Sequence, residues 1–269
     1  MPANDARGTW LEVSAAWSKD AAELTRGVVF SPIRGAGLVD QTVRRLGEAI
    51  DFGLLQSGEQ LPPEPDLAGR LQVSPMTLRE ALAALRQAGY LVTRRGRLGG
   101  TFVQAPEPSQ LLAAQQLLPD LSVDEIRDLL DYRETIASGT AALACERVQP
   151  DDLALLEELM DRMRAAQSYG AWRRIDSRFH ITIAAAAKSP RLVAAEAAVQ
   201  ADLGAALGLN ARHPRVLRVI DDQHKRIFAA IASGDSVAAV AATQAHVRNT
   251  AETLLGLSMT RQVAATPVR

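Results

Sequence analysis

The first part of the chain alternates short helical patterns with loops. Between Leu38 and Phe52 the apolar positions recur at roughly a helical period, and glycines and a proline-rich run follow them. Pro65 suits a first helical turn, where a missing N–H costs little. The pattern therefore predicts a first helix over about 38–52 and a short second helix over about 64–71.

A third helix and a pair of strands follow. Ser74 can cap the free N–H groups of a helix, and Pro75 has the φ angle that suits the first helical position. This helix stops at Gly89. Two short β-prone runs, 90–93 and 101–103, flank a turn rich in arginine and glycine and predict a hairpin. Three helices followed by a hairpin are the layout of a winged helix-turn-helix.

The second half has almost entirely helical periodicity. Ser122 and Glu125 have the spacing of a capping box, which opens the first long helix. Short separators divide the rest, so an antiparallel bundle is the expected arrangement. The fold class is mainly α, with helices expected at about 122–148, 151–167, 170–187, 190–208, 214–233 and 235–257.

These patterns divide the chain into five segments. A helical bundle and a winged helix-turn-helix are joined by a stretch with three prolines, in which a helix over 109–118 fits the pattern. We expect a poorly ordered extension with at most one short helix (1–33), the winged unit (34–104), a linker (105–121), the helical domain (122–257) and a tail (258–269).

Composition limits the classes of protein. The 269 residues are 47% hydrophobic and 23% charged, which argues against a wholly disordered chain. The sequence contains no window of 18 uncharged apolar residues, so it predicts no membrane span. The N-terminal residues lack the features of a secretory signal. Cys145 has no partner for an internal disulfide. We expect a cytoplasmic protein.

The net charge of −1 conceals an uneven distribution. Residues 34–104 carry nine Lys+Arg and seven Asp+Glu, and five arginines fall within 79–97. The N-terminal residues of a recognition helix meet base edges in the major groove, and a wing tip can approach phosphates or the minor groove. Arg79 suits either guanine or a phosphate. The candidate DNA-binding residues are Ser74, Met76, Thr77, Arg79, Arg94, Arg95, Gly96 and Arg97.

Three of the four histidines have spacings that suit a metal centre. Asp176 and His180 are four residues apart on one predicted helix, so both side chains lie on one face. His224 and His246 lie on the fifth and sixth predicted bundle helices. One carboxylate and three imidazoles satisfy a divalent metal and leave one or two positions for water or a carboxylate ligand. Zn²⁺ fits best, and Ni²⁺ or Mn²⁺ are compatible.

The segment 53–103 resembles the DNA-binding domain of the GntR family of bacterial transcriptional regulators. The resemblance rests on spaced elements in the right order: Gly58 with Leu61-Pro62, Glu64 with Leu67-Ala68, Val73-Ser74, Thr77-x-Arg79-Glu80-Ala81-Leu82, Gly89 and Gly99-Gly100-Thr101-Phe102-Val103. Pro65 and Pro75 stand where family members commonly carry arginines that touch DNA. The resemblance therefore implies an unusual operator and a flatter salt dependence of binding.

Residues of about 123–257 resemble the FCD effector domain of the FadR-type subfamily. The matching elements are Asp176-x-x-Phe179-His180, Asp222-Gln223-His224 with Ile227, and His246-Val247. In metal-binding members this pattern supplies the ligands, here Asp176, His180, His224 and His246; His213 has no place in it. Arg133 matches an arginine that often meets the carboxylate of an organic acid. Ala137 and Ser189 replace a usual glutamate and asparagine, which leaves the acid's identity open.

The resemblance implies a regulator that binds double-stranded DNA as a homodimer on a palindromic site. Expected in particular is a metal-containing repressor that a small organic acid releases from DNA, with no enzymatic activity and no membrane partner. Two alternatives remain: a DNA-binding protein whose bundle only dimerises, and a metal-dependent enzyme. No motif for a catalytic carboxylate or nucleophile accompanies the histidines, which disfavours the enzyme.

Overall fold

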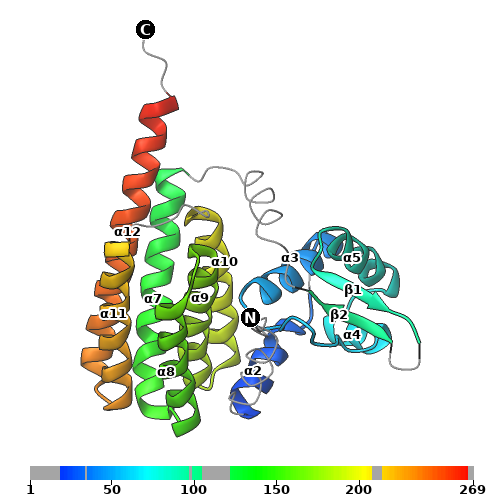
Figure 1. Ribbon diagram of the computed structural model, residues 1–269, viewed down its shortest axis with the longest axis horizontal. Coiled ribbons are helices and arrows are strands. Elements are labelled where there is room, and N and C mark those ends of the chain that lie inside the picture. Colours follow the sequence, from blue (N-terminus) through cyan, green and yellow to red (C-terminus); the bar gives the residue numbers. More distant parts are fainter. Residues whose placement is uncertain (1–18, 34, 97–98, 105–121, 208–213, 266–269) are drawn as a thin grey trace, which may run out of the picture.

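The computed structural model describes residues 19–33, 35–96, 99–104, 122–207 and 214–265. A small unit of helices and strands lies beside a bundle of long helices (Figure 1). In chain order the elements are α2 (Lys19–Val29), α3 (Leu38–Asp51), α4 (Glu64–Leu71), α5 (Pro75–Gln87), β1 (Leu91–Arg94), β2 (Gly100–Val103), α7 (Val123–Arg147), α8 (Pro150–Ala165), α9 (Tyr169–Ala186), α10 (Pro190–Leu207), α11 (Pro214–Ala232) and α12 (Ser236–Ala265).

Helices α3 to α5 and the two strands form the expected winged helix-turn-helix. The Ser74 hydroxyl accepts a hydrogen bond from the Thr77 amide at 3.0 Å, so α5 begins at the predicted cap. The strands pair antiparallel, with Leu91 opposite Val103. Fully buried leucines of α4 and α5 fill the core of the unit. The predicted mainly helical fold class is confirmed.

Helices α7 to α12 form the bundle. The capping box at its start is present, because the Ser122 hydroxyl accepts from the Glu125 amide and the Glu125 carboxylate accepts from the Ser122 amide. Helix α7 packs against α9, α10, α11 and α12, which makes it the central helix. Within the described ranges, no helix is both long and apolar enough to cross a membrane.

Two segments differ from the expected boundaries. Helix α2 lies in the segment expected to be poorly ordered, and Val29, Phe30 and Ile33 at and after its end are buried. Packing against α9 and α10 stabilises this helix, and its own sequence does not reveal that packing. Helix α12 continues past 257 to Ala265, because strong helix formers surround Gly256 and offset its low helix propensity.

The winged unit and the bundle share one apolar core. Ile181, Ala184 and Ala185 of α9 and Val193 of α10 belong to the same buried cluster as the leucines of α3 to α5. Helix α2 lies between the winged unit and α10 (Figure 1). The bundle and the winged unit are therefore coupled through this cluster and through α2.

Partly buried carboxyl groups lie at this domain interface. Burial raises the pKa of Glu48 on α3 to about 7. Arg44 and Arg45 oppose this shift, whereas Asp202 of α10 and Asp51 add to it. The folded state therefore holds a proton on Glu48 at pH values where the unfolded chain does not.

Replacing Glu48 by glutamine is expected to stabilise the protein at pH 8 and to leave its stability unchanged near pH 4. Because the folded pKa exceeds the unfolded value of 4.5, the wild-type protein loses stability as the pH rises from about 4.5 through 7. Glutamine cannot ionise, so the expected gain at pH 8 is about 1–3 kcal/mol. Denaturant unfolding at both pH values measures it.

The control is Glu252→Gln, which removes a carboxylate from an exposed position of α12. It should change stability little at either pH. An equal gain for Glu48→Gln at pH 4 and pH 8 would show that ionisation of Glu48 is not the cause.

Asp51, at the end of α3, holds the residue at which the wing begins. Its carboxylate accepts a hydrogen bond from the Tyr90 hydroxyl at 3.1 Å, and Tyr90 directly precedes β1. Burial raises the pKa of Asp51 to about 6, while the Tyr90 hydrogen bond and the charge of Arg174 on α9 act in the opposite direction. The Tyr90 hydrogen bond joins the base of the wing to the end of α3.

Candidate DNA-binding surface and histidine centre

The start of α5 presents a polar, accessible surface. Met76 is 64% exposed although it is apolar, and Ser74 and Arg79 are also exposed. Arg79 Nε donates to a Glu64 carboxylate oxygen at 3.3 Å, and both side chains are largely in solvent. Such an ion pair contributes little to stability, so the guanidinium is available for another partner.

The wing tip extends from the same unit. The Arg94 guanidinium lies over the Phe102 ring at 4.4 Å from its centroid, which orients a long cation on the hairpin. Arg95 is exposed, and Gly96 has a φ angle of 110°, which favours glycine. Arg97 lies outside the described residues.

Three histidines meet in the interior of the bundle. His180 comes from α9, His224 from α11 and His246 from α12, and all three are buried. Their ring centroids lie 4.8–5.3 Å apart. One nitrogen from each ring lies within 4.8 Å of the others. The three rings can therefore face one ion, as the resemblance to the FCD domain implies.

Asp176 adds a carboxylate to the three rings. Its Oδ1 lies 3.3 Å from His224 Nε2 and 3.9 Å from His180 Nε2. Its Oδ2 accepts a hydrogen bond from Arg173 Nη1 at 2.9 Å. Arg173 thus fixes one carboxylate oxygen and leaves the other facing the histidines, as outer-shell partners of metal ligands do.

The ionisation states suit metal coordination. Burial raises the pKa of the Asp176 carboxyl, but His224, His180 and Arg173 outweigh this and hold the pKa well below its usual range. Burial lowers the pKa of His180 and of His246 well below the usual value, so both rings are neutral. A carboxylate and neutral imidazoles are the forms that bind divalent metals.

The hydrogen bonding of the rings also fits an ion. His180 Nε2 and both nitrogens of His224 are buried and make no hydrogen bond among the described residues. Buried polar atoms without partners are rare and costly in folded proteins. A cation between the rings would satisfy them, so the buried triad of His180, His224 and His246 can hold a metal ion.

Arg133 reaches the centre from α7. Its Nη2 lies 3.2 Å from His246 Nε2, and a guanidinium can only donate a hydrogen bond. His246 Nε2 is therefore the acceptor, and its Nδ1 carries the proton and donates to Gln223 Oε1 at 3.2 Å. This geometry assigns one neutral tautomer to His246 and places a buried cation beside the histidines.

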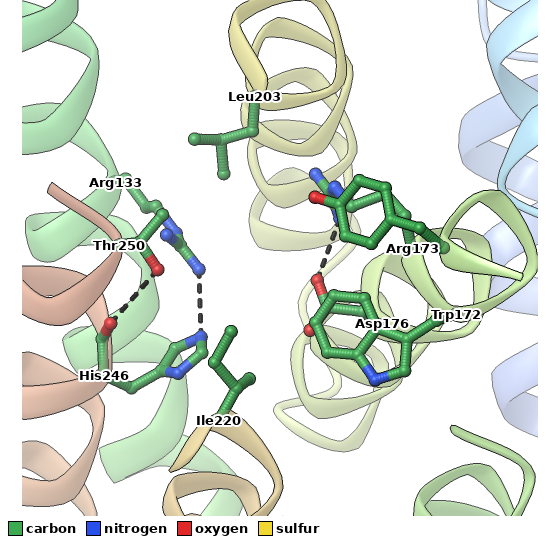
Figure 2. A pocket seen from close by; sticks show the side chains of 9 residues that line it. Arg133, Trp172, Arg173, Asp176, Leu203, Ile220, His246 and Thr250 are labelled. Carbon is green, nitrogen blue, oxygen red and sulfur yellow. Dashed lines mark hydrogen bonds and ion pairs between the residues drawn. The ribbon is translucent and has the colours of Figure 1, made fainter. Parts of the chain in front are cut away.

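A small cavity adjoins the centre. Arg133 and His246 lie on one side of it and face Asp176 and Arg173 on the other (Figure 2). Its volume of about 20 Å³ is sufficient for a water molecule. A larger ligand requires these side chains to move apart.

Sequence reasoning missed the residues that orient the ligands. Arg173 lies three positions before Asp176 on α9 and also binds the side chain and carbonyl oxygen of Gln200 on α10. The three-residue spacing between Arg173 and Asp176 places both on one helix face, and this spacing could have identified Arg173 from the sequence. Gln223 precedes His224 and orients His246, which no local pattern indicates. His213 lies outside the described residues.

Two family models match the chain. The model of the bacterial regulatory proteins of the gntR family matches residues 38–103, and that of the FCD domain matches residues 128–249. These ranges contain the winged unit and the histidine centre. All four proposed ligands and Arg133 fall within the FCD match.

Curated relatives agree with these models. RmpR of Mycobacterium gastri, assigned as an HTH-type transcriptional regulator, is 45% identical over 162 residues, 60% of this chain and 59% of RmpR. The HTH-type transcriptional regulator LutR of Bacillus subtilis (strain 168) is 28% identical over 77% of this chain and 96% of its own. An Escherichia coli K12 protein assigned to regulation of the L-lactate dehydrogenase operon is 31% identical over 78% of this chain and 83% of its own.

These relatives are transcriptional regulators and not enzymes. The match with RmpR spans less than two thirds of that protein. The two family models and the long match to the Escherichia coli regulator show that the chain belongs to the GntR family of bacterial DNA-binding transcriptional regulators, in the FadR-type subfamily that carries an FCD domain.

Proposed function

We propose that the protein is a metal-containing transcriptional repressor that a small organic acid releases from DNA. The observation that carries this proposal is the convergence of Asp176 and three buried histidines beside the Arg133 guanidinium. The histidines supply nitrogen ligands, and the arginine supplies a charge complementary to a carboxylate. Membership of the family supports DNA binding, whereas repression and release by an acid are the parts that we propose.

The DNA-binding half would work as one member of a dimer. In this proposal residues 34–104 bind one half of a palindromic site, and residues 122–257 bind the effector and dimerise. The accessible start of α5 enters the major groove, and the wing approaches the backbone or minor groove. The proposed contacts are Ser74, Met76, Thr77, Arg79, Arg94, Arg95, Gly96 and Arg97.

The metal would be held by Asp176, His180, His224 and His246. Nitrogen ligands with one carboxylate favour Zn²⁺, while Ni²⁺ and Mn²⁺ remain compatible with the same set. When bound, such an ion supplies open coordination positions for oxygen atoms of a ligand. Arg173 keeps the Asp176 carboxylate oriented toward the histidines.

Arg133 would bind the acid's carboxylate in place of His246. Its Nη2 already lies at the small cavity, and a planar guanidinium can bind both carboxylate oxygens. The name of the Escherichia coli relative refers to an L-lactate dehydrogenase operon, which makes hydroxy acids the first ligands to test.

Two structural connections can transmit the effect of ligand binding from the histidine centre to the winged unit. Asp176 is linked through Arg173 to Gln200 on α10, and both α9 and α10 contribute side chains to the core shared with α3 to α5. An acid that prefers one setting of α9 and α10 shifts DNA affinity by its difference in affinity for the two settings.

The experiment that tests this function is selection of bound sequences from random duplex DNA by the full chain. We expect enrichment of a palindromic site, because a symmetric dimer presents two identical reading helices. Sequence-independent binding at moderate salt would contradict the proposed regulator. Specific binding that no acid changes would instead favour a bundle that only dimerises.

A further inference from the structure

A second cavity lies between the winged unit and the bundle. Its volume is about 160 Å³, and its walls come from α2 and α3 on one side and from α10 on the other. It shares no lining residue with the small cavity at the histidine centre. It is therefore a separate feature, and both domains contribute to it.

Small side chains on α10 create this space. Ala194, Ala197 and Ala198 lie on one face of α10 at helical spacing and line the cavity, while Val28 and Val29 line it from α2. Ala194 and Ala198 are exposed and Arg45 and Glu48 are partly buried, so the cavity opens to solvent and a small molecule can enter it. A cavity of about 150 Å³ in another protein accommodates benzene, so this one can hold a ring-sized molecule.

The charged part of the cavity wall comes from α3. Arg45 Nη1 donates to the Ser31 carbonyl oxygen at 2.8 Å and to the Ser31 hydroxyl at 2.9 Å, which holds the guanidinium at the wall. Glu48 lies beside it, but burial raises the pKa of this carboxyl to about 7, so it neutralises Arg45 only in part at neutral pH. An apolar space with one incompletely neutralised cation favours an amphipathic anion.

We propose that this interdomain cavity binds a small monocarboxylic acid with a ring-sized apolar body. The carboxylate contacts Arg45, and the apolar body lies between the valines of α2 and the alanines of α10. Such a ligand touches both domains at once, so it favours the domain arrangement in which the cavity exists. This site is independent of the histidine centre.

Fluorine NMR titrations with 4-fluorobenzoate and 4-fluorobenzamide test the proposal on the full chain. The two probes share one apolar body and differ in charge. We expect 4-fluorobenzoate to bind at least tenfold more tightly than the amide. Ala197→Leu, which fills the cavity, should weaken 4-fluorobenzoate binding at least tenfold. Arg45→Gln should remove the difference between the probes.

Three controls make the outcome decisive. Ala245→Leu adds the same side chain at an exposed position of α12 and should leave binding unchanged. His224→Ala should also leave it unchanged, because the histidine centre is not involved. Thermal unfolding shows whether Ala197→Leu and Arg45→Gln fold. If one variant does not fold, the other still tests the proposal.

Two results would overturn the proposal. One is equal binding of 4-fluorobenzoate to the wild-type protein, folded Ala197→Leu and folded Arg45→Gln. The other is loss of binding in His224→Ala, which would place the probe at the histidine centre. Metal content is measured in a separate experiment, so failure of this proposal would not count against the proposed metal site.

Discussion

The His224→Ala variant is expected to retain less than about a tenth of the divalent metal that the wild-type protein carries after dialysis. His224 is fully buried, and its ring nitrogens have no hydrogen-bond partner among the described residues. Loss of an outer-shell partner alone lowers metal affinity about 10- to 100-fold, and loss of a direct ligand costs more. Asp176→Ala should have a similar effect. Elemental analysis of the purified proteins measures both.

The matched control is Thr250→Ala. Thr250 is buried beside the centre and donates a hydrogen bond to the His246 carbonyl oxygen, but it belongs to no ligand set. Its variant should keep the wild-type metal content. Unchanged metal content in both His224→Ala and Asp176→Ala would exclude the proposed ligands.

Replacing Arg79 by alanine is expected to weaken binding to the selected operator about 10- to 100-fold. A good arginine contact to a base edge contributes about 1–3 kcal/mol of discrimination. The folded structure should tolerate the change, because the lost ion pair to Glu64 is exposed. Binding measured at two salt concentrations distinguishes the partners. A phosphate contact lowers the salt slope by about one, whereas a base contact relaxes specificity at one position.

Arg127→Ala is the control for this variant. Arg127 lies on α7, is similarly exposed, and forms a comparable ion pair with Asp124 at 3.2 Å. Its loss removes the same charge outside the winged unit and should leave operator affinity within about twofold, since binding depends mainly on charges near the DNA. Equal weakening by both variants would mean that net charge, and not position 79, determines affinity.

The fold was predictable where local signals define an element. Ser74 and Ser122 cap helices through contacts three residues away, and such contacts are visible in the sequence. The sequence allowed one short helix in the N-terminal extension, but the packing of α2 on α9 and α10 was not predictable. The continuation of α12 past 257 was not predicted, and the helix formers on both sides of Gly256 offset its low helix propensity.

The candidate site likewise has features that the sequence predicts and features that it does not. Asp176 and His180 share a helix face by spacing, and the resemblance to the FCD domain joined His224 and His246 to them. The orientation of these ligands depends on contacts between helices, such as Arg173 with Gln200 and His246 with Gln223. The sequence contains no pairing signal for such contacts, and the interdomain cavity likewise depends on how α10 packs against α2.

Operator affinity in the presence of acid tests the central claim most directly. The protein is measured with its metal and after removal of the metal by chelation, each with and without L-lactate, malate or citrate. The account predicts that at least one acid weakens operator binding about five- to 150-fold in the metal-loaded protein and has no effect on the stripped protein. An equal shift in both forms, or no shift with any of the acids, would contradict it.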